Sequence, residues 1–227
     1  MSGSSSPLIL AIETLGAACA AAVHDHAGER SRIVEEIGRG HAERVVDLCA
    51  ETLQRGDVSW SELTHVAVAT GPGSFAGIRA GVAAARGFAL SLGIPAVGVT
   101  AFEAIADGAE AAGEKFPITV VLPAPKGRVF AQTFSAPNQA ADDARLNDLS
   151  KFEIAAETVV GPVADLFVDR VERAVAVTVD VGAVARVAAR RIRANDHQPA
   201  EPFYLRGPDA AAPRPPLPRA ERSNQAA

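Results

Sequence analysis

The feature that most constrains the fold of this chain is a glycine-rich break between a strand-like run and a helix-like run. Residues 66–69 are short, apolar and partly β-branched, as in a buried parallel strand, and Gly71-Pro72-Gly73 end that strand. Ser74 is placed to cap the helix that follows. The first turn of such a helix favours a phosphate or carboxylate, but an ordinary strand-to-helix turn has the same pattern, and both interpretations stay open.

The helix after Ser74 is rich in small residues. Gly77, Gly81 and Ala84 fall on one helical face, so another backbone can approach that face closely. Each glycine costs roughly 1 kcal/mol relative to alanine in a helix. We therefore expect tight packing of this face, either inside the domain or against a partner.

The composition excludes several classes of protein. A chain of 227 residues with 48% hydrophobic content has a core large enough for two lobes, which we predict, and its net charge of −5 argues against a strongly basic nucleic-acid-binding surface. Cys19 and Cys49 lack metal-ligand spacing, which indicates a reducing, cytoplasmic environment without a disulfide framework. We find no export signal and no apolar run approaching the roughly 20 residues of a membrane span, so we expect a soluble protein.

Periodicity predicts three strands, two helices, and then strand, helix, strand and helix through residue 112. The first two strands form a hairpin with its turn at Glu13-Thr14-Leu15-Gly16. Strands that first meander and then alternate with helices imply a mixed sheet with helices packed on it. The predicted strands are 8–12, 19–23, 33–37, 66–69 and 94–99, and the predicted helices are 41–53, 59–63, one after Ser74, and 101–112.

The pattern restarts near residue 114. Residues 118–122 and 128–134 are predicted to pair as strands, and residues 152–160 form a third apolar segment. We divide the chain into a first lobe at 1–112, a second, smaller lobe at 113–206, and a disordered tail rich in proline and alanine at 207–227. The tail has the PxxP spacing of ligands for polyproline-binding domains.

An amphipathic helix is predicted at 181–193, and its polar side is basic. The basic residues form either a solvated face or a contact with RNA or protein. They are Arg186, Arg190, Arg191 and Arg193.

Four segments resemble the TsaB (YeaZ) family, the partner subunit in bacterial threonylcarbamoyladenosine modification of tRNA. These segments are residues 9–14, 40–44, 71–79 continuing to Gly98-Val99-Thr100, and 202–206. The resemblance spans about residues 8 to 209 and is strongest up to about residue 106. It implies an α/β, actin-like ATPase (ASKHA) fold with two lobes, each a mixed β-sheet flanked by helices.

The resemblance also bears on catalysis. In the catalytic relative TsaD, a His-x-x-x-His pair on the helix after strand 94–99 binds metal, and those positions hold Ala101 and Ile105 here. Val45 stands one turn after His41, a lone histidine at a helix start that we interpret as a capping or surface residue. The resemblance therefore implies a subunit with no catalytic residue and no metal site of its own.

The sequence contains only part of the nucleotide-binding pattern of the superfamily. Many catalytic members of the superfamily hold magnesium and phosphates with an acidic residue and a hydroxyl at the first turn, and Glu13 and Thr14 keep this pattern. The candidate phosphate contacts are Glu13, Thr14, Gly71, Gly73 and Ser74. No cofactor is expected on this chain alone, whereas ATP or ADP and a metal are expected in the complex.

The resemblance implies a set of partners. They are a TsaD homologue in a heterodimer, a TsaE-like ATPase, a functionally linked TsaC-type enzyme, and tRNA through the complex; a homodimer in isolation stays open, and no membrane is implied. The helices at 41–53 and 75–91 are the expected partner face, and a leucine at Gly81 is expected to abolish pairing while the monomer stays folded. The interface candidates are His41, Val45, Leu48, Phe75, Gly77, Ile78, Gly81 and Ala84.

Three other functions remain as alternatives. A small actin-like ATPase or kinase has its residues in Glu13, Thr14 and 71–74, and a metallopeptidase lacks the histidine pair. Direct tRNA capture by the basic helix predicts binding that falls steeply with salt. The sequence also departs from the family at Pro123-Ala124-Pro125, where relatives commonly carry Asp-Ala-Arg, which leaves the role of that loop open.

Overall fold

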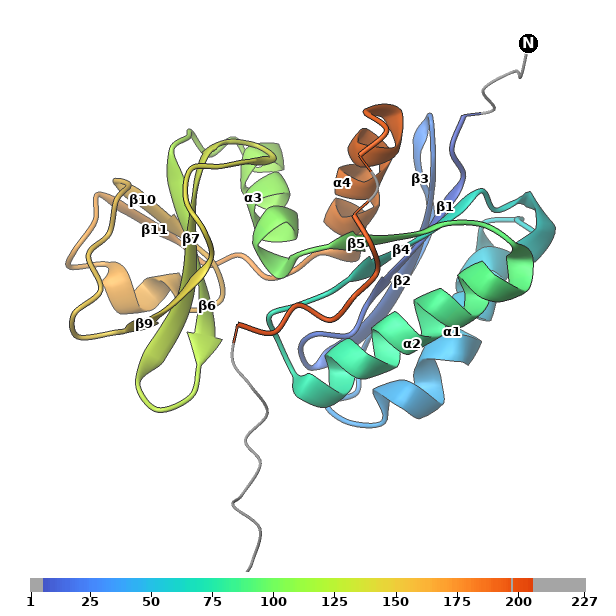
Figure 1. Ribbon diagram of the computed structural model, residues 1–227, viewed down its shortest axis with the longest axis horizontal. Coiled ribbons are helices and arrows are strands. Elements are labelled where there is room, and N and C mark those ends of the chain that lie inside the picture. The colour runs from blue at the N-terminus through green and yellow to red at the C-terminus, as the bar shows by residue number, and fades with distance from the viewer. Residues whose placement is uncertain (1–5, 197, 206–227) are drawn as a thin grey trace, which may run out of the picture.

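The structure, a computed structural model, describes residues 6–196 and 198–205 and has two lobes, each built on one β-sheet (Figure 1). The first sheet has the order β3-β2-β1-β4-β5, and the second has the order β11-β10-β6-β7-β8, with β9 paired to β7. The strands of the first sheet are β1 (Ile9–Glu13), β2 (Ala18–Asp25), β3 (Gly28–Glu36), β4 (His65–Ala69) and β5 (Ala96–Val99). Those of the second are β6 (Ile118–Ala124), β7 (Arg128–Ala136), β8 (Gln139–Ala140), β9 (Arg145–Asp148), β10 (Thr158–Val160) and β11 (Arg173–Val175).

Helices cover both faces of the first sheet. α1 and α2 pack on one face, α4 packs on the other, and α3 stands between the lobes against α4 and the second sheet (Figure 1). The helices are α1 (His41–Arg55), α2 (Phe75–Leu92), α3 (Ala101–Ala111) and α4 (Val181–Arg193), with short 3-10 turns at Trp60–Glu62 and Ala164–Phe167.

The predicted order of elements through residue 111 is confirmed. β1 is buried along its whole length, which explains its continuous apolar sequence, and it pairs antiparallel with β2 and parallel with β4. Because β1 and β4 are parallel, the β1–β2 turn and the loop between β4 and α2 both lie at the carboxyl end of these strands. The candidate site is therefore assembled by the sheet.

The second lobe differs from its prediction. The antiparallel pair β6 and β7 is confirmed, but the apolar segment at 152–160 contributes only the three-residue strand β10. β8, β9 and β11 were not predicted, because strands of two to four residues are too short to show a period.

The assignment of the whole of 113–206 to the second lobe is corrected by the structure. α4 packs on the first sheet, and Pro199 forms an antiparallel bridge with Val97 of β5. The Phe203 amide then donates to the Thr70 carbonyl, at 2.9 Å. The chain thus returns to the first lobe before its end, while the tail predicted at 207–227 lies outside the described residues.

One hydrophobic core joins the two lobes. It includes Ile12 of β1, Phe102 of α3, and Ile118 and Phe134 of the second sheet, all nearly inaccessible. A smaller cluster around Phe167 belongs to the second lobe. The lobes are therefore connected by packed side chains as well as by the chain.

α2 is the one helix in the described ranges that is long and apolar enough to cross a membrane by length and composition. This corrects the expectation that no apolar run comes near that length. One third of its residues (33%) are buried inside the protein. The core helix of a soluble protein can have the same length and apolar composition. In this structure α2 packs against β4 and α1.

Candidate functional site

The glycine face of α2 packs against the β1–β2 turn. The Thr14 hydroxyl donates to the Gly77 carbonyl at 2.8 Å, and a Cβ placed on Gly77 would lie 1.9 Å from the Thr14 carbonyl oxygen. A Cβ on Gly81 would lie 2.4 Å from Thr14 Oγ1. These glycines thus permit α2 to approach the β1–β2 turn of the same chain, and this contact lies within the first lobe. A leucine at Gly81 would collide with Thr14, so this substitution disturbs the packing of the monomer as well as any pairing.

The glycine-rich loop is fastened to the same turn. The Ser74 hydroxyl accepts from the Gly77 amide at 3.3 Å, which confirms the predicted cap of α2. The Ser74 amide donates to the Leu15 carbonyl at 2.8 Å, and a Cβ on Gly73 would touch Leu15. Gly71 is buried beneath the Phe203 carbonyl. The loop therefore has a structural function in holding the turn.

Glu13 closes the turn from the inside. It is 4% exposed, and its Oε1 accepts from the Leu15 amide at 2.6 Å. Burial raises the pKa of Glu13 to about 7, with the charges of Glu36 and Asp180 adding to the rise, while hydrogen bonds from the amides of Leu15 and Gly16 oppose it. The Glu13 carboxylate thus accepts hydrogen bonds from two backbone amides of its own turn.

Several hydrogen-bonding groups around the β1–β2 turn are engaged within the protein. The amides of Leu15, Gly16, Ser74 and Gly77 already have acceptors within the protein, and the Thr14 hydroxyl is used by Gly77. A phosphate held at a turn needs such amides free, together with positive charge. Glu13, Thr14, Gly73 and Ser74 meet at this turn, where Glu13, Thr14 and Ser74 form hydrogen bonds within the protein, whereas Gly71 lies against Phe203 and Ile78.

The interface candidates divide by exposure. Phe75 is 39% exposed and Ala84 is half-buried, whereas the other six are buried in the first lobe: His41, Val45, Leu48, Gly77, Ile78 and Gly81. The prediction that those six form the partner interface is therefore corrected, because side chains packed on the sheet are not presented to a partner. The opposite side of the same two helices carries exposed apolar residues, which we call the outer face: Ala42, Val46, Ala50, Phe75, Ala76, Ala83, Gly87 and Leu90. Helical periodicity could have found them, since they alternate with the buried set.

His41 is neither a capping nor a surface residue. It is 8% exposed, and its Nε2 lies 3.0 Å from the Ala18 carbonyl, so it joins α1 to β2. Gly40, in the left-handed region at φ 84°, begins the helix without a side-chain cap.

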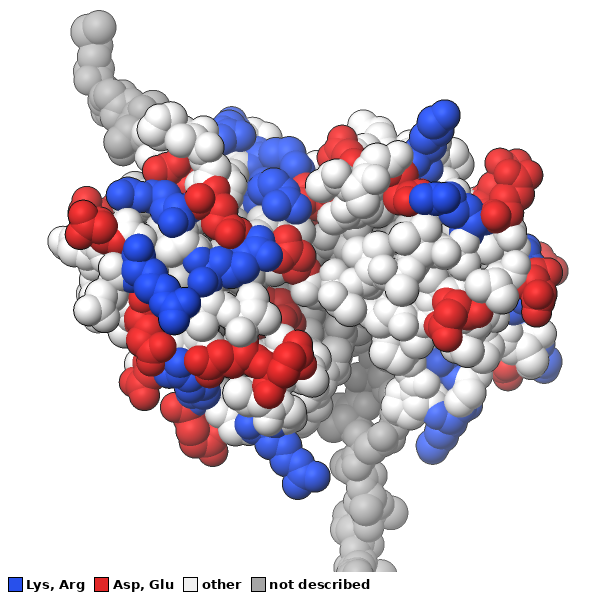
Figure 2. Space-filling view, turned by 180° about the vertical axis from the view of Figure 1, so that it is seen from behind, with Lys and Arg blue, Asp and Glu red and all other residues white. Residues whose placement is uncertain are grey.

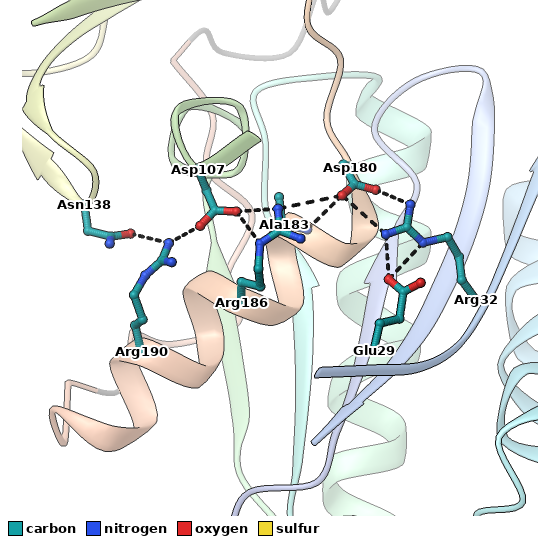
Figure 3. A network of polar contacts seen from close by, with 8 residues as sticks. All are labelled: Glu29, Arg32, Asp107, Asn138, Asp180, Ala183, Arg186 and Arg190. Atoms are coloured by element: carbon teal, nitrogen blue, oxygen red, sulfur yellow. Dashed lines mark hydrogen bonds and ion pairs between the residues drawn. The ribbon is translucent and has the colours of Figure 1, made fainter. Parts of the chain in front are cut away.

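Three of the four basic residues of α4, Arg186, Arg190 and Arg191, form ion pairs within the protein, whereas Arg193 is exposed; Figure 3 shows the pairs of Arg186 and Arg190. Asp107 of α3 is 2% exposed, accepts from Arg186 Nε at 2.8 Å, and also pairs with Arg190. Arg190 reaches the second lobe as well, donating to Asn138 at 3.2 Å. These arginines therefore join α4 to α3 instead of forming a solvated face.

The same network continues to the edge of the first sheet. Asp180 caps α4 by accepting from the Ala183 amide and pairs with Arg32 of β3 at 2.7 Å (Figure 3). Arg191 pairs with Glu103. On the face shown in Figure 2, positive and negative side chains are interspersed, without a separate basic surface of the kind that grips RNA.

Comparison with known proteins identifies the family of this chain. The family described as TsaD, tRNA N6-adenosine threonylcarbamoyltransferase, matches residues 33–205. The tRNA threonylcarbamoyladenosine biosynthesis protein TsaB of Escherichia coli strain K12 is 30% identical over 122 residues, which are 54% of this chain and 52% of that protein. The chain thus spans about half the length of the curated relatives it matches.

Two solved structures from Pseudomonas aeruginosa have the same fold. One, a protein with similarity to peptidase YeaZ, has a TM-score of 0.78 at 20% identity and covers 88% of this chain and 100% of its own. The other, YeaZ, has a TM-score of 0.77 at 18% identity with the same coverage. The predicted α/β architecture of two lobes, each a mixed β-sheet flanked by helices, is confirmed.

Proposed function

Because this chain belongs to the TsaD family of tRNA N6-adenosine threonylcarbamoyltransferases, in its TsaB (YeaZ) branch, we propose that it is a non-catalytic subunit. It pairs with a TsaD homologue and supports threonylcarbamoyl transfer to the adenosine next to the tRNA anticodon. The partner carries the catalytic groups.

One observation carries this proposal. The positions that the resemblance aligns with the metal-binding histidine pair are Ala101 and Ile105, both with 0% exposure at the start of α3. A methyl group and an aliphatic side chain have no atom that ligates a metal ion. This chain therefore contributes no metal ligand at that position, and a subunit with such a substitution needs a catalytic partner.

The outer face of α1 and α2 supports pairing through helices. Val46 is 49% exposed and Leu90 is 86% exposed, and small residues such as Ala50, Ala83 and Gly87 accompany them. Contiguous exposed apolar residues are typical of an interaction surface, and small ones let a partner's helix approach closely. We assign the TsaD homologue to this face.

The remaining parts of the proposal follow from the family. A TsaE-like ATPase joins the pair, a TsaC-type enzyme supplies the activated threonylcarbamoyl group, and ATP or ADP and a metal ion bind in the complex. The chain acts in the cytoplasm, and without its partner the outer face favours a homodimer.

The test is co-purification with the TsaD homologue of the same cell, followed by a tRNA modification assay that omits each subunit in turn. We expect a stable heterodimer and no modification without this chain. Val46→Arg on the outer face is expected to weaken pairing about tenfold or more, because it buries a charge in an apolar contact. Val168→Arg, at a valine that is 59% exposed in the second lobe, is the matched control.

Two results would overturn the proposal. One is full tRNA modification without this chain. The other is the absence of any association with the TsaD homologue combined with nucleotide turnover by the isolated chain. Equal pairing by the Val46→Arg and Val168→Arg variants would remove the assignment of the outer face.

A further inference from the structure

A pocket of about 490 Å³ lies between the lobes, beside the β1–β2 turn. Its floor is the α4 side of the first sheet, where Glu13, Ala20 and Val34 are aligned across three strands and Glu36 lies opposite Ala18. Because alanine side chains are short, Ala18 and Ala20 leave space above the sheet. The opposite wall is formed by Leu122 and Pro123 of β6 and by residues 178–181 before and at the start of α4.

Glu13 is a buried acid without a positive partner. Its hydrogen bonds come from the amides of Leu15 and Gly16, and no Lys, Arg or His within the described ranges forms an ion pair with it. A buried carboxylate charge is unfavourable unless it is paired, so this side chain either keeps its proton or needs a cation from outside the chain.

The other charged groups of the pocket strengthen this requirement. Three carboxylates line it, those of Glu13, Glu36 and Asp180, against the single guanidinium of Arg32. Arg32 is already paired with Glu29 and Asp180, whereas Glu36 has no ion pair among the residues that the structure describes. The pocket therefore repels the phosphates of a nucleotide and attracts a cation.

A metal ion does not fit this arrangement. In the described part of the chain, no three His, Cys, Asp or Glu side chains lie close enough together to hold one. The volume is instead in the range of small-molecule sites, and much of the lining is apolar, with Val34 on the floor and Leu122 and Val179 on the wall. Pro123 of β6 adds to that apolar wall.

We propose that this pocket binds an aliphatic amine, whose ammonium group donates to Glu13 and whose alkyl chain packs on Val34, Leu122 and Val179. In a diamine the second ammonium group reaches Glu36. The proposal goes beyond the subunit function and does not depend on it, since the pocket belongs to the isolated chain. It replaces the nucleotide expected at this turn by a ligand of opposite charge.

The first experiment is calorimetric titration of the full chain with 1,4-diaminobutane about one pH unit above the Glu13 pKa of about 7. The uncharged control is 1,4-butanediol, which has the same length and lacks the charge. We expect the diamine to bind about tenfold or more tightly than the diol. Below the Glu13 pKa, binding is expected to release a proton, which titration in two buffers of different ionisation enthalpy measures.

Variants locate the site. Glu13→Gln keeps the size and an acceptor for the turn, and it is expected to weaken diamine binding about tenfold or more. Glu36→Gln, at an exposed residue, is expected to weaken it severalfold without affecting the turn, and Glu43→Gln on α1 is the control that leaves it unchanged. A loss in either pocket variant supports the site.

Three results would overturn the proposal: equal affinity for diamine and diol, unchanged diamine binding in both pocket variants, or displacement of the diamine by magnesium-ATP. None of these results bears on pairing with the TsaD homologue, which co-purification tests separately.

Discussion

At Gly77 the absence of a single methyl group sets how closely α2 approaches the β1–β2 turn. The Thr14 carbonyl oxygen occupies the place of a Cβ, 1.9 Å from where that atom would stand, and the Thr14 hydroxyl is bonded to the Gly77 carbonyl. A side chain at Gly77 would force the backbone of α2 away from the backbone of the β1–β2 turn at Thr14. Gly87, ten residues along the same helix, has nothing within 4 Å of its would-be Cβ.

These two glycines form a matched pair for substitution. We expect Gly77→Ala to lower the free energy of unfolding by about 2 kcal/mol or more, because α2 must shift and its bond to Thr14 is lost. Gly87→Ala is expected to raise it by about 1 kcal/mol through helix propensity alone. Urea denaturation of both variants measures the difference, and equal effects would contradict the assigned contact.

Glu13 makes stability depend on pH. Its pKa is raised by burial from 4.5 to about 7, so between those values the folded chain binds the proton more tightly than the unfolded chain. Stability is therefore highest below about pH 4.5 for this group and falls as the pH rises through about 7, by on the order of 3 kcal/mol.

Glu13→Gln removes that titration. We expect the free energy of unfolding of the variant, relative to the unaltered chain, to increase from about pH 5 to about pH 8, as measured by urea denaturation at each pH. Glu43→Gln, at an exposed residue of α1, provides the baseline. A difference that does not change with pH would show that Glu13 titrates normally in the folded chain.

At the scale of elements, Asp107 fastens α4 to α3. It is 2% exposed and faces two arginines of α4, each about one third exposed. Because α3 packs on the second sheet and α4 on the first, this ion pair also joins the lobes. Two of the arginines considered for direct capture of tRNA, Arg186 and Arg190, are thus neutralised by this carboxylate, whereas Arg193 is exposed.

Removal of that carboxylate should be damaging. Asp107→Asn leaves Arg186 and Arg190 side by side, and we expect a loss of about 2 to 3 kcal/mol, below the full value for a buried pair since the arginines reach solvent. Adding Arg186→Gln and Arg190→Gln to this variant should restore part of the loss. Thermal denaturation tests this, with Glu110→Gln, an exposed residue on α3, as control. A strictly additive loss in the triple variant would contradict the pairing.

At the scale of the whole molecule, the shared core predicts that the lobes unfold together. Phe134 of β7 is 1% exposed and belongs to the same cluster as the first lobe. The single tryptophan of the chain, Trp60, lies in the first lobe against Phe88. Its fluorescence therefore reports on one lobe while a substitution is made in the other.

We expect Phe134→Ala to lower stability by about 3 to 5 kcal/mol and to move the transition seen by Trp60 fluorescence together with that seen by circular dichroism. Val168→Ala, at an exposed valine of the second lobe, should change stability by less than about 0.5 kcal/mol. A Trp60 transition that stays in place in the Phe134→Ala variant would mean that the lobes unfold independently.

The sequence by itself determined the order of elements through residue 111, the first hairpin and the Ser74 cap, since periodicity and capping are local properties. Only the tertiary structure decided what Gly77 and Gly81 approach, which acids neutralise α4, and that α4 returns to the first lobe. Each of these depends on groups far apart in the chain: Thr14 lies 63 residues from Gly77, and Asp107 lies 79 residues from Arg186. Local patterns record that a small residue or a charge is present, whereas its partner is chosen by how the sheets and helices pack.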